Sequence, residues 1–138
     1  MSFTLTERAY ISGIIDDEGS IILTKFHNNQ YPAPCVSIIS TTIELLQWIK
    51  EKTKVGTIKS KKNYNKDNHK DSYTYAVKYN DAIELLKQIQ PYLIIETKKK
   101  RAELILAKYK KATPRNGRYN EQMKANKERF YEEFISIK

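Results

Sequence analysis

The sequence predicts an α+β fold, in which helices cover one face of a four-stranded antiparallel sheet and more helices follow at the C-terminal end. Capped stretches of helical period alternate with pairs of short stretches rich in β-branched residues. The resulting order, αββαββα, favours hairpins and therefore an antiparallel sheet. The 138 residues suffice for one domain. We expect its core over about 4–110 and a C-terminal helical extension over about 118–138.

The first half of the chain gives one helix, two strands and a second helix. Thr4 and Glu7 have the spacing of a capping box, and the helix that follows should end near Asp17. Strands are expected at 20–26 and 33–40 because both stretches are rich in β-branched residues. The next helix should begin at Thr41. Its expected capping partner is Glu44, and its expected buried stripe is Thr42, Leu45, Leu46 and Ile49.

The second half repeats this layout. Strands are expected at 57–61 and 73–78, on either side of a polar loop. Asn80 or Asp81 should open a helix that Pro91 stops. A further helix is expected from Thr97, and a last one from about Asn120 with four apolar side chains aligned: Met123, Phe130, Phe134 and Ile137.

The charge balance indicates a polyanionic partner. Lysine and arginine number 25 against 16 acids, a net charge of +9, which suits nucleic acid or an anionic membrane surface. No apolar run is long enough to span a bilayer, and the N-terminus lacks a secretory signal, so we expect no membrane attachment. The single cysteine, Cys35, excludes an internal disulfide and favours an intracellular, reducing compartment. Nothing in the sequence distinguishes an organellar, bacterial or phage origin.

An acidic cluster stands where the first helix should end. Asp16, Asp17 and Glu18 follow an apolar run that contains Ser12 and Gly13. Because the carbonyl groups at a helix C-terminus carry partial negative charge, acids are unfavourable there. Their oxygens could hold a divalent cation, which would offset this repulsion. The cluster therefore predicts a metal site.

A basic cluster shows the opposite mismatch. Lys98, Lys99, Lys100 and Arg101 lie at the start of a predicted helix, where the helix dipole is positive and cations are disfavoured. A bound phosphate would offset this repulsion. The sequence thus predicts metal and phosphate chemistry at two helix ends.

The residues Ile11 to Gly19 resemble the LAGLIDADG motif of homing endonucleases. Gly13, Asp16 and Gly19 are identical to the motif, and its hydrophobic positions are conservatively filled. Glu18 replaces the usual aspartate at the second acidic position, and Asp17 replaces a small residue. The element order also resembles that family's domain. So does the stretch QPYLII followed by KKKRA, at 90–95 and 98–102.

The resemblance implies a sequence-specific DNA endonuclease that hydrolyses both strands of a long, near-palindromic site, leaving 5′-phosphate and 3′-hydroxyl ends. It implies Mg²⁺, for which Mn²⁺ can substitute. Glu18 would be a catalytic metal ligand, and the backbone carbonyl of Asp17 a further ligand. Alignment on Ala102 makes Lys98 the active-site lysine, with Lys99 or Lys100 as alternatives. Asp16 would be structural, pairing with backbone near the helix end.

The single copy of the motif implies a homodimer, with the two motif helices packed side by side at the dyad. Ser12 and Gly13 would permit close approach of the two backbones. A symmetric dimer would read a nearly palindromic site.

The open face of the sheet is the predicted DNA-binding surface, because a two-stranded ribbon fits the major groove. Alternation along the strands selects its expected members. These are Ser20, Ile22, Thr24, Phe26, Asn28, Tyr31, Ala33, Cys35, Ser37, Thr57, Lys59, Lys61, Tyr73 and Tyr75. Residues 50–70 add eight lysines and only two acids, which is typical of a surface that contacts phosphates.

Two other functions fit parts of the pattern. A nucleic-acid-binding protein without cleavage activity, such as a maturase acting on intron RNA, would use the same basic face. It would gain little from Glu18 beside phosphates, which favours the enzyme. A basic structural protein with no site would require the motif to be coincidental.

Overall fold

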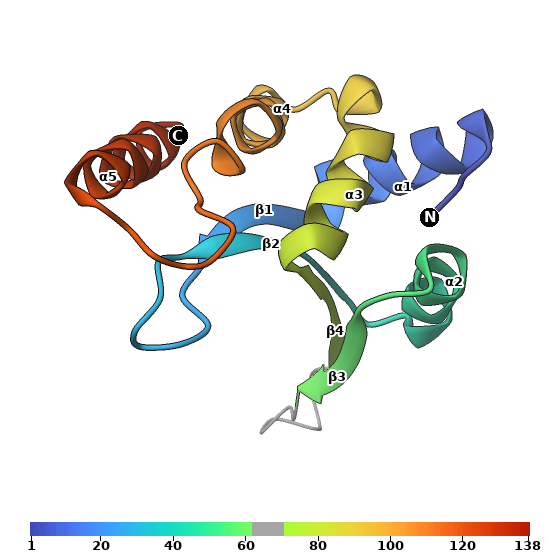
Figure 1. The fold of residues 1–138 in the computed structure, drawn as a ribbon. Helices are drawn as coiled ribbons and strands as arrows, with labels where there is room; N and C mark the ends of the chain where they lie inside the picture. Colours follow the sequence, from blue (N-terminus) through green and yellow to red (C-terminus); the bar gives the residue numbers. More distant parts are fainter. Residues whose placement is uncertain (62–70) are drawn as a thin grey trace.

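The computed structural model describes residues 1–61 and 71–138, and its elements follow the predicted αββαββα order (Figure 1). The first unit is α1 (Leu5–Glu18), β1 (Gly19–Thr24) and β2 (Ala33–Ser40). The second is α2 (Ile43–Thr53), β3 (Thr57–Lys61) and β4 (Ser72–Lys78). They are followed by α3 (Tyr79–Ile89), the 3₁₀ turn η1 (Gln90–Tyr92), α4 (Glu96–Leu104), the π-helical turn η2 (Ile105–Tyr109) and α5 (Glu121–Ile135).

The sheet has four strands in the order β1-β2-β4-β3, and every neighbouring pair is antiparallel. Figure 1 shows α1, α3 and α4 on one side of β1 and β2, with no described helix on the other side. The predicted architecture is confirmed. The core lies between the sheet and these helices, and its fully buried members include Ile11, Ile15, Ile21, Val36, Ile38, Tyr75, Leu85, Leu86 and Ile89.

The capping box at the start of α1 is confirmed. The N–H of Glu7 donates to the Thr4 hydroxyl at 3.1 Å, and the N–H of Thr4 donates to the Glu7 carboxylate at 3.0 Å. Gly19 ends the helix, where an added Cβ would lie 2.7 Å from the Cα of Ile15. Only glycine therefore allows β1 to leave the helix so closely, and this places Glu18 at the junction of helix and strand.

The start of α2 differs from the prediction. Thr42 is its N-cap, and neither Thr42 nor Glu44 makes the expected side-chain cap. Instead, the Ser40 hydroxyl accepts the N–H of Thr42 at 3.0 Å. Thr42 is exposed and does not belong to the buried stripe, which contains Leu46, Ile49 and Thr53. The hydrogen bond expected from a threonine at the start of the helix is thus made by Ser40, at the end of β2.

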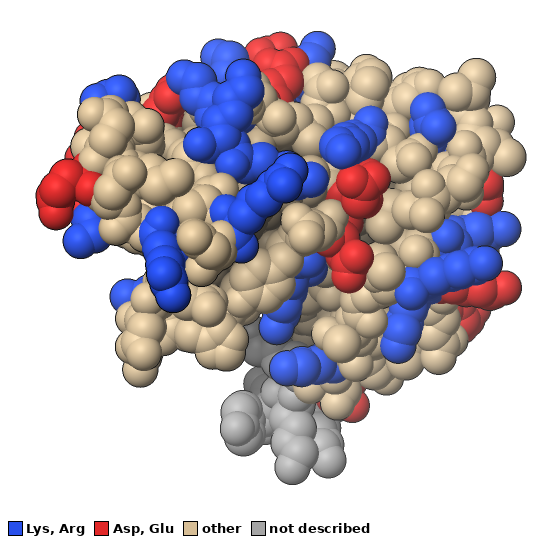
Figure 2. All heavy atoms as spheres, viewed as in Figure 1, with Lys and Arg blue, Asp and Glu red and all other residues tan. Residues whose placement is uncertain are grey.

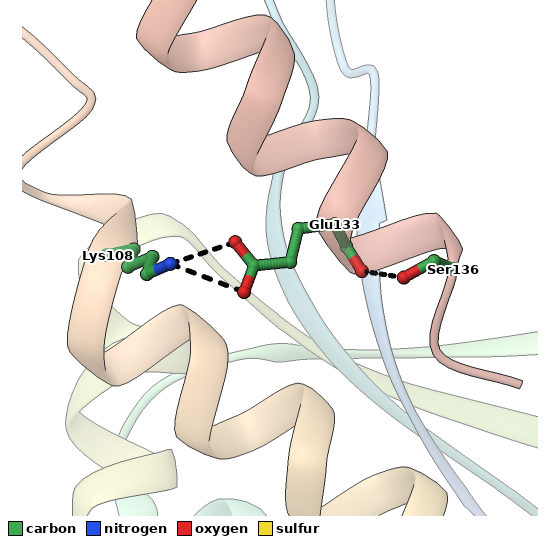
Figure 3. Close-up of polar contacts among 3 residues, drawn as sticks. All are labelled: Lys108, Glu133 and Ser136. Carbon is green, nitrogen blue, oxygen red and sulfur yellow. Dashed lines mark hydrogen bonds and ion pairs between the residues drawn. The ribbon is translucent and has the colours of Figure 1, made fainter.

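The C-terminal helix α5 packs on α4 and the π-helical turn through mixed contacts. The Lys108 ammonium lies 2.9 Å from the Glu133 carboxylate, and the Ser136 hydroxyl donates to the Glu133 carbonyl (Figure 3). Arg101 donates to the carbonyl of Ile137 at 3.1 Å. No helix in the described part of the chain is both long and apolar enough to cross a membrane.

Candidate active site

Asp16 holds the segment after α3 against the end of α1. Its two carboxylate oxygens accept the backbone N–H groups of Ile94 at 2.9 Å and Ile95 at 3.2 Å. These groups precede α4 and have no partner within that helix. Asp16 therefore has the structural role that was predicted for it.

Lys98 lies at the C-terminal end of α1. Its ammonium donates to the carbonyl of Ile15 at 2.8 Å and to that of Asp16 at 2.6 Å. A cation at this position interacts favourably with the helix dipole, and the carbonyl of Ile15 accepts from Lys98 in addition to the backbone N–H of Gly19. Lys98 is partly buried, whereas Lys100 is exposed. Of the two lysines, Lys98 is the one that the fold brings to the acidic motif.

Asp17 and Glu18 are exposed at the same helix end. Both line an open groove of about 410 Å³ along α1, together with Tyr10, Gly13 and Leu45. Neither carboxylate forms an ion pair with a described residue. Over residues 1–61 and 71–138, no three Asp, Glu, His or Cys side chains come together as a metal site.

The two residues predicted to form a dimer contact are placed differently. Ser12 is fully buried, and its hydroxyl lies 2.7 Å from the carbonyl oxygen of Arg8 and 2.9 Å from that of Ile89. The prediction that Ser12 contacts a second copy is therefore wrong, since the residue is covered by α3 of its own chain. Gly13 is exposed, and an added Cβ would meet nothing within 4 Å. Gly13 thus lies on an uncovered surface of α1.

The register puts most of the predicted DNA-binding residues on the open face. Ser20, Ile22 and Thr24 lie opposite Ser37, Cys35 and Ala33 respectively. From the other pair of strands, Thr57, Lys59 and Lys61 lie opposite Ala76, Thr74 and Ser72. In β1, β2 and β3 the residues predicted to face outward therefore do so. Thr74 and Ala76 of β4 also belong to this face. Residues 62–70, which hold part of the predicted basic stretch, lie outside the described residues.

Tyr73 and Tyr75 were assigned to the wrong face. Tyr75 pairs with Ile38 and Tyr73 with Ser40, on the core side of the sheet. The Tyr75 hydroxyl lies 2.6 Å from that of Thr53 and donates to the carbonyl of Val55 at 2.9 Å. Burial raises the pKa of Tyr75 to about 12. Two polar partners beneath the sheet let a phenol enter the core, which alternation alone could not indicate.

Two small residues on the open face offer little surface. Ala33 is 2% exposed and Cys35 is 6% exposed, although their register is as predicted. Burial also raises the pKa of the Cys35 thiol. The prediction that these two side chains contact DNA needs correction, because both are buried. Asn28 is exposed in the hairpin loop, and Phe26 and Tyr31 are partly buried beside it.

Two features of the structure were not predicted. Tyr79 has a φ of 55°, which a residue other than glycine adopts at a cost in free energy. Lys127 is 2% exposed on the apolar side of α5. Its position, four residues after Met123 and three before Phe130, was the available signal, since it falls within the apolar stripe of that helix.

Comparison with known proteins shows similarity in structure. The homing endonuclease I-CvuI in complex with its target matches with a TM-score of 0.71 and 17% identity, over 97% of this chain and 83% of that one. The archaeal intron-encoded homing endonuclease I-Vdi141I in complex with DNA gives 0.62 and 19%, over 96% and 84%. The LAGLIDADG homing endonuclease I-GzeII with its DNA target gives 0.63 and 21%, over 94% and 43%.

No family model matches the sequence, and no curated protein sequence matches it significantly. At 17 to 21% identity, the likeness to solved structures concerns the fold. The chain therefore has the LAGLIDADG homing-endonuclease fold, as its sequence predicted.

Proposed function

We propose that this chain is a sequence-specific DNA endonuclease that uses divalent metal ions and acts as a homodimer. It would hydrolyse both strands of a long, near-palindromic site. One observation carries the proposal: the exposed acids Asp17 and Glu18 and the cation of Lys98 converge on one end of α1. Solved structures with this fold include homing endonucleases in complex with DNA, which supports the same reading.

The Glu18 carboxylate and the Asp17 backbone carbonyl would hold Mg²⁺, or Mn²⁺ in its place. The donor set fits, because Mg²⁺ is usually held by one or two carboxylates together with water and phosphate oxygens. The exposed, unpaired state of the Glu18 side chain leaves its oxygens available. When bound, the metal would polarise the scissile phosphate and stabilise the leaving oxygen.

Lys98 and Asp16 would supply the fixed frame of the site. Asp16 binds the backbone just before α4, and this helix carries Lys98. The Lys98 ammonium, bonded to two carbonyls of α1, is held where it could stabilise negative charge on a phosphate beside Glu18. Such preorganised charge is effective because it needs no rearrangement during the reaction.

A homodimer would complete the site and match the two DNA strands. The groove beside Gly13 and Tyr10 runs along the exposed side of α1 and ends at Glu18. Tyr10 is 53% exposed, an apolar surface that a second α1 could cover. Two-fold packing there would bring the two Glu18 side chains near one another, so that each could serve one strand.

The substitution Glu18→Gln tests the catalytic assignment. We expect cleavage of a cognate duplex in Mg²⁺ to fall by at least about 10–100-fold, which is what loss of a group that only supports a metal ligand costs. Duplex affinity should persist, since the variant removes a negative charge. Glu128→Gln is the matched control, because Glu128 is an exposed helical acid without an ion pair to a described residue. It should cleave like the wild type.

A pool of randomised duplexes, selected for cleavage in Mg²⁺, would provide the cognate site. The selected sites should be nearly palindromic and should support cutting of both strands. If the Glu18→Gln variant cleaved the duplex at the wild-type rate, the assignment of Glu18 as a metal ligand would be wrong. A wild-type protein that binds nucleic acid but never cleaves would instead indicate the alternative, a binding protein such as an intron RNA maturase.

A further inference from the structure

A cationic pocket lies between the start of α3 and the segment after the π-helical turn. It has a volume of about 800 Å³, and its lining includes Tyr79, Tyr109, Lys110, Lys111 and Arg115. Figure 2 shows Lys and Arg side chains gathered over α4 and the segment that follows it. From 104 to 120 the sequence has five lysines and arginines and no acid. The pocket is therefore suited to an anion.

The cations of this pocket belong to the many basic side chains that form no ion pair with a described residue. Lys52, Lys87, Lys108 and Lys124 each lie within 4.0 Å of a glutamate. Lys110, Lys111 and Arg115 form no ion pair with a described residue. Their full charge is thus available to a ligand, which is the condition for strong phosphate binding.

A buried cation lies behind the pocket. The Lys127 ammonium donates to the hydroxyl of Thr113, which itself lines the pocket. It also lies 4.0 Å from the centre of the Tyr109 ring. Since Lys127 is 2% exposed, water screens it little, and its charge adds to the positive potential of the lining.

The pocket adjoins the end of the open sheet face that is distant from Glu18. β1 begins at Gly19 beside Glu18, and its six residues span about 20 Å. Beyond its far end, the Phe26 ring lies 5.1 Å from that of Tyr79 and 4.6 Å from the ammonium of Lys78. Lys78 belongs to the open face opposite Cys35, and Tyr79, the next residue, lines the pocket. The sheet face and the pocket therefore meet at the consecutive residues Lys78 and Tyr79.

We propose that this pocket binds a backbone phosphate of DNA on the outer side of each half-site, beyond the bases that the sheet reaches. The inference rests on the proposed function, because it requires DNA on the open face. The chemistry favours a phosphodiester: three cations converge, no acid lines the pocket, and phosphate contacts position a protein without reading sequence.

The test compares two variants that each lose two positive charges. Lys110→Gln with Arg115→Gln removes pocket cations. Lys87→Gln with Lys124→Gln removes two exposed lysines whose acidic partners lie on the same helix. Ethylation of single phosphates in a selected cognate duplex, followed by separation of bound from free DNA, identifies the phosphates that each protein needs. Urea unfolding verifies that both variants fold.

For the pocket variant, we expect that ethylation of the outermost phosphates of each half-site no longer weakens binding, whereas ethylation of the inner phosphates still does. Binding should weaken roughly tenfold at physiological salt, and the slope of log Kd against log salt should fall by about 1 for each phosphate that the variant no longer binds. The control variant should keep the wild-type pattern.

Four results would overturn the inference. An unchanged pattern in the pocket variant, with wild-type binding and cleavage intact, would remove this inference alone. The same would follow if the control variant lost the outer phosphates equally, or if the pocket bound inorganic phosphate while the DNA pattern stayed unchanged. A wild-type protein that binds no duplex would refute the proposed function together with the inference.

Discussion

The ammonium of Lys98 lies 2.6 Å from the carbonyl oxygen of Asp16, at the end of the helix that carries the acidic motif. The sequence places acids at the C-terminal end of α1 and lysines at the N-terminal end of α4, and each has the sign that the helix dipole disfavours. The contact offsets part of both mismatches, since a cation from the start of α4 meets the negative end of α1. Lys98 therefore has a structural role that does not depend on any bound metal or phosphate.

Replacing Lys98 with methionine should accordingly affect both stability and activity. Two carbonyls would lose a charged donor, so we expect the free energy of unfolding to fall by about 1–2 kcal/mol. Cleavage should be lost as well, because the charge beside Glu18 would be missing. Urea unfolding and cleavage of a cognate duplex measure the two effects.

The matched control is Lys100→Met, two residues along the same helix, where the side chain is exposed. It should change the unfolding free energy by no more than about 0.5 kcal/mol. If the folded Lys98→Met protein cleaved at the wild-type rate, its assignment as the active-site lysine would be wrong.

Much of the fold could be predicted because local signals agreed with each other. The Thr4–Glu7 capping box and the β-branched stretches gave the first helix and both strands of the first hairpin. The face of β4 could not be assigned in this way. Tyr73 and Tyr75 alternate correctly with their neighbours, yet the partners of Tyr75, Thr53 and Val55, come from a segment about twenty residues earlier. Alternation shows that two sets of side chains face opposite ways, but which set faces the core depends on the segment that packs against the strand.

The candidate site was predictable where helix-end electrostatics were the signal. The acidic and basic clusters followed from charges placed against a helix dipole, and the family resemblance singled out Asp16 and Lys98 within them. Ser12 was misassigned for the opposite reason, because a small residue permits close approach to any helix, and the helix that approaches is α3 of the same chain. The burial of Lys127 had a signal in the apolar stripe of α5, but its contacts with Thr113 and Tyr109 depend on how α5 packs, which no local pattern encodes.

The different placements of Ser12 and Gly13 predict separable effects on stability and assembly. Ser12→Ala removes a buried hydroxyl that lies within hydrogen-bond distance of the Arg8 and Ile89 carbonyls, at a cost of about 1–2 kcal/mol. It should leave the oligomeric state unchanged. Gly13→Leu should fold, because its Cβ meets open space within the chain, but it should weaken the proposed dimer.

Sedimentation equilibrium with and without duplex checks the assembly, and urea unfolding checks the stability. A Gly13→Leu protein that dimerises as tightly as the wild type would contradict the use of this helix face. Dissociation caused by Ser12→Ala at full stability would contradict the burial of Ser12 within its own chain.

Substitution of Tyr75 should change stability but not DNA affinity, and substitution of Lys59 should do the reverse, because the two residues lie on opposite faces of the sheet. Tyr75→Phe removes the hydroxyl that bonds to Thr53 and Val55, and we expect a loss of about 1–3 kcal/mol with unchanged DNA affinity. Lys59→Gln should keep its stability and bind duplex more weakly, with a salt slope lower by about 1 per subunit. Fluorescence anisotropy across a salt series distinguishes them. If the folded Tyr75→Phe protein bound DNA more weakly than the wild type, Tyr75 would contact DNA from the open face, as the sequence predicted.

Asp16→Asn tests the carboxylate that binds two backbone N–H groups. One oxygen would become an amide that cannot accept, so either Ile94 or Ile95 would lose its partner, costing about 1–3 kcal/mol. Asp17→Asn, at an exposed neighbouring position, should leave the unfolding free energy within about 0.5 kcal/mol of wild type. Equal unfolding midpoints for both variants would contradict a structural role for Asp16.

The buried ammonium of Lys127 predicts that stability depends on pH. Burial lowers its pKa from 10.5 to about 8, so the folded chain holds fewer protons than the unfolded chain between these values. Stability should therefore rise with pH across this window, by on the order of 3 kcal/mol in total. Above about pH 10 the trend should reverse, because burial raises the pKa of Tyr75 to about 12 and the fold retains its neutral phenol.

Lys127→Met isolates this contribution, since an unbranched side chain one atom shorter replaces the lysine without its charge. At pH 7 the variant should be more stable than the wild type by about 1–3 kcal/mol, because a charge no longer has to leave water. Between pH 7 and 9.5 the wild-type curve should approach that of the variant. Lys124→Met, at an exposed position on α5, should remain parallel to wild type throughout. A constant difference between wild type and Lys127→Met over this range would mean that Lys127 titrates normally, and that α5 docks without burying a charge.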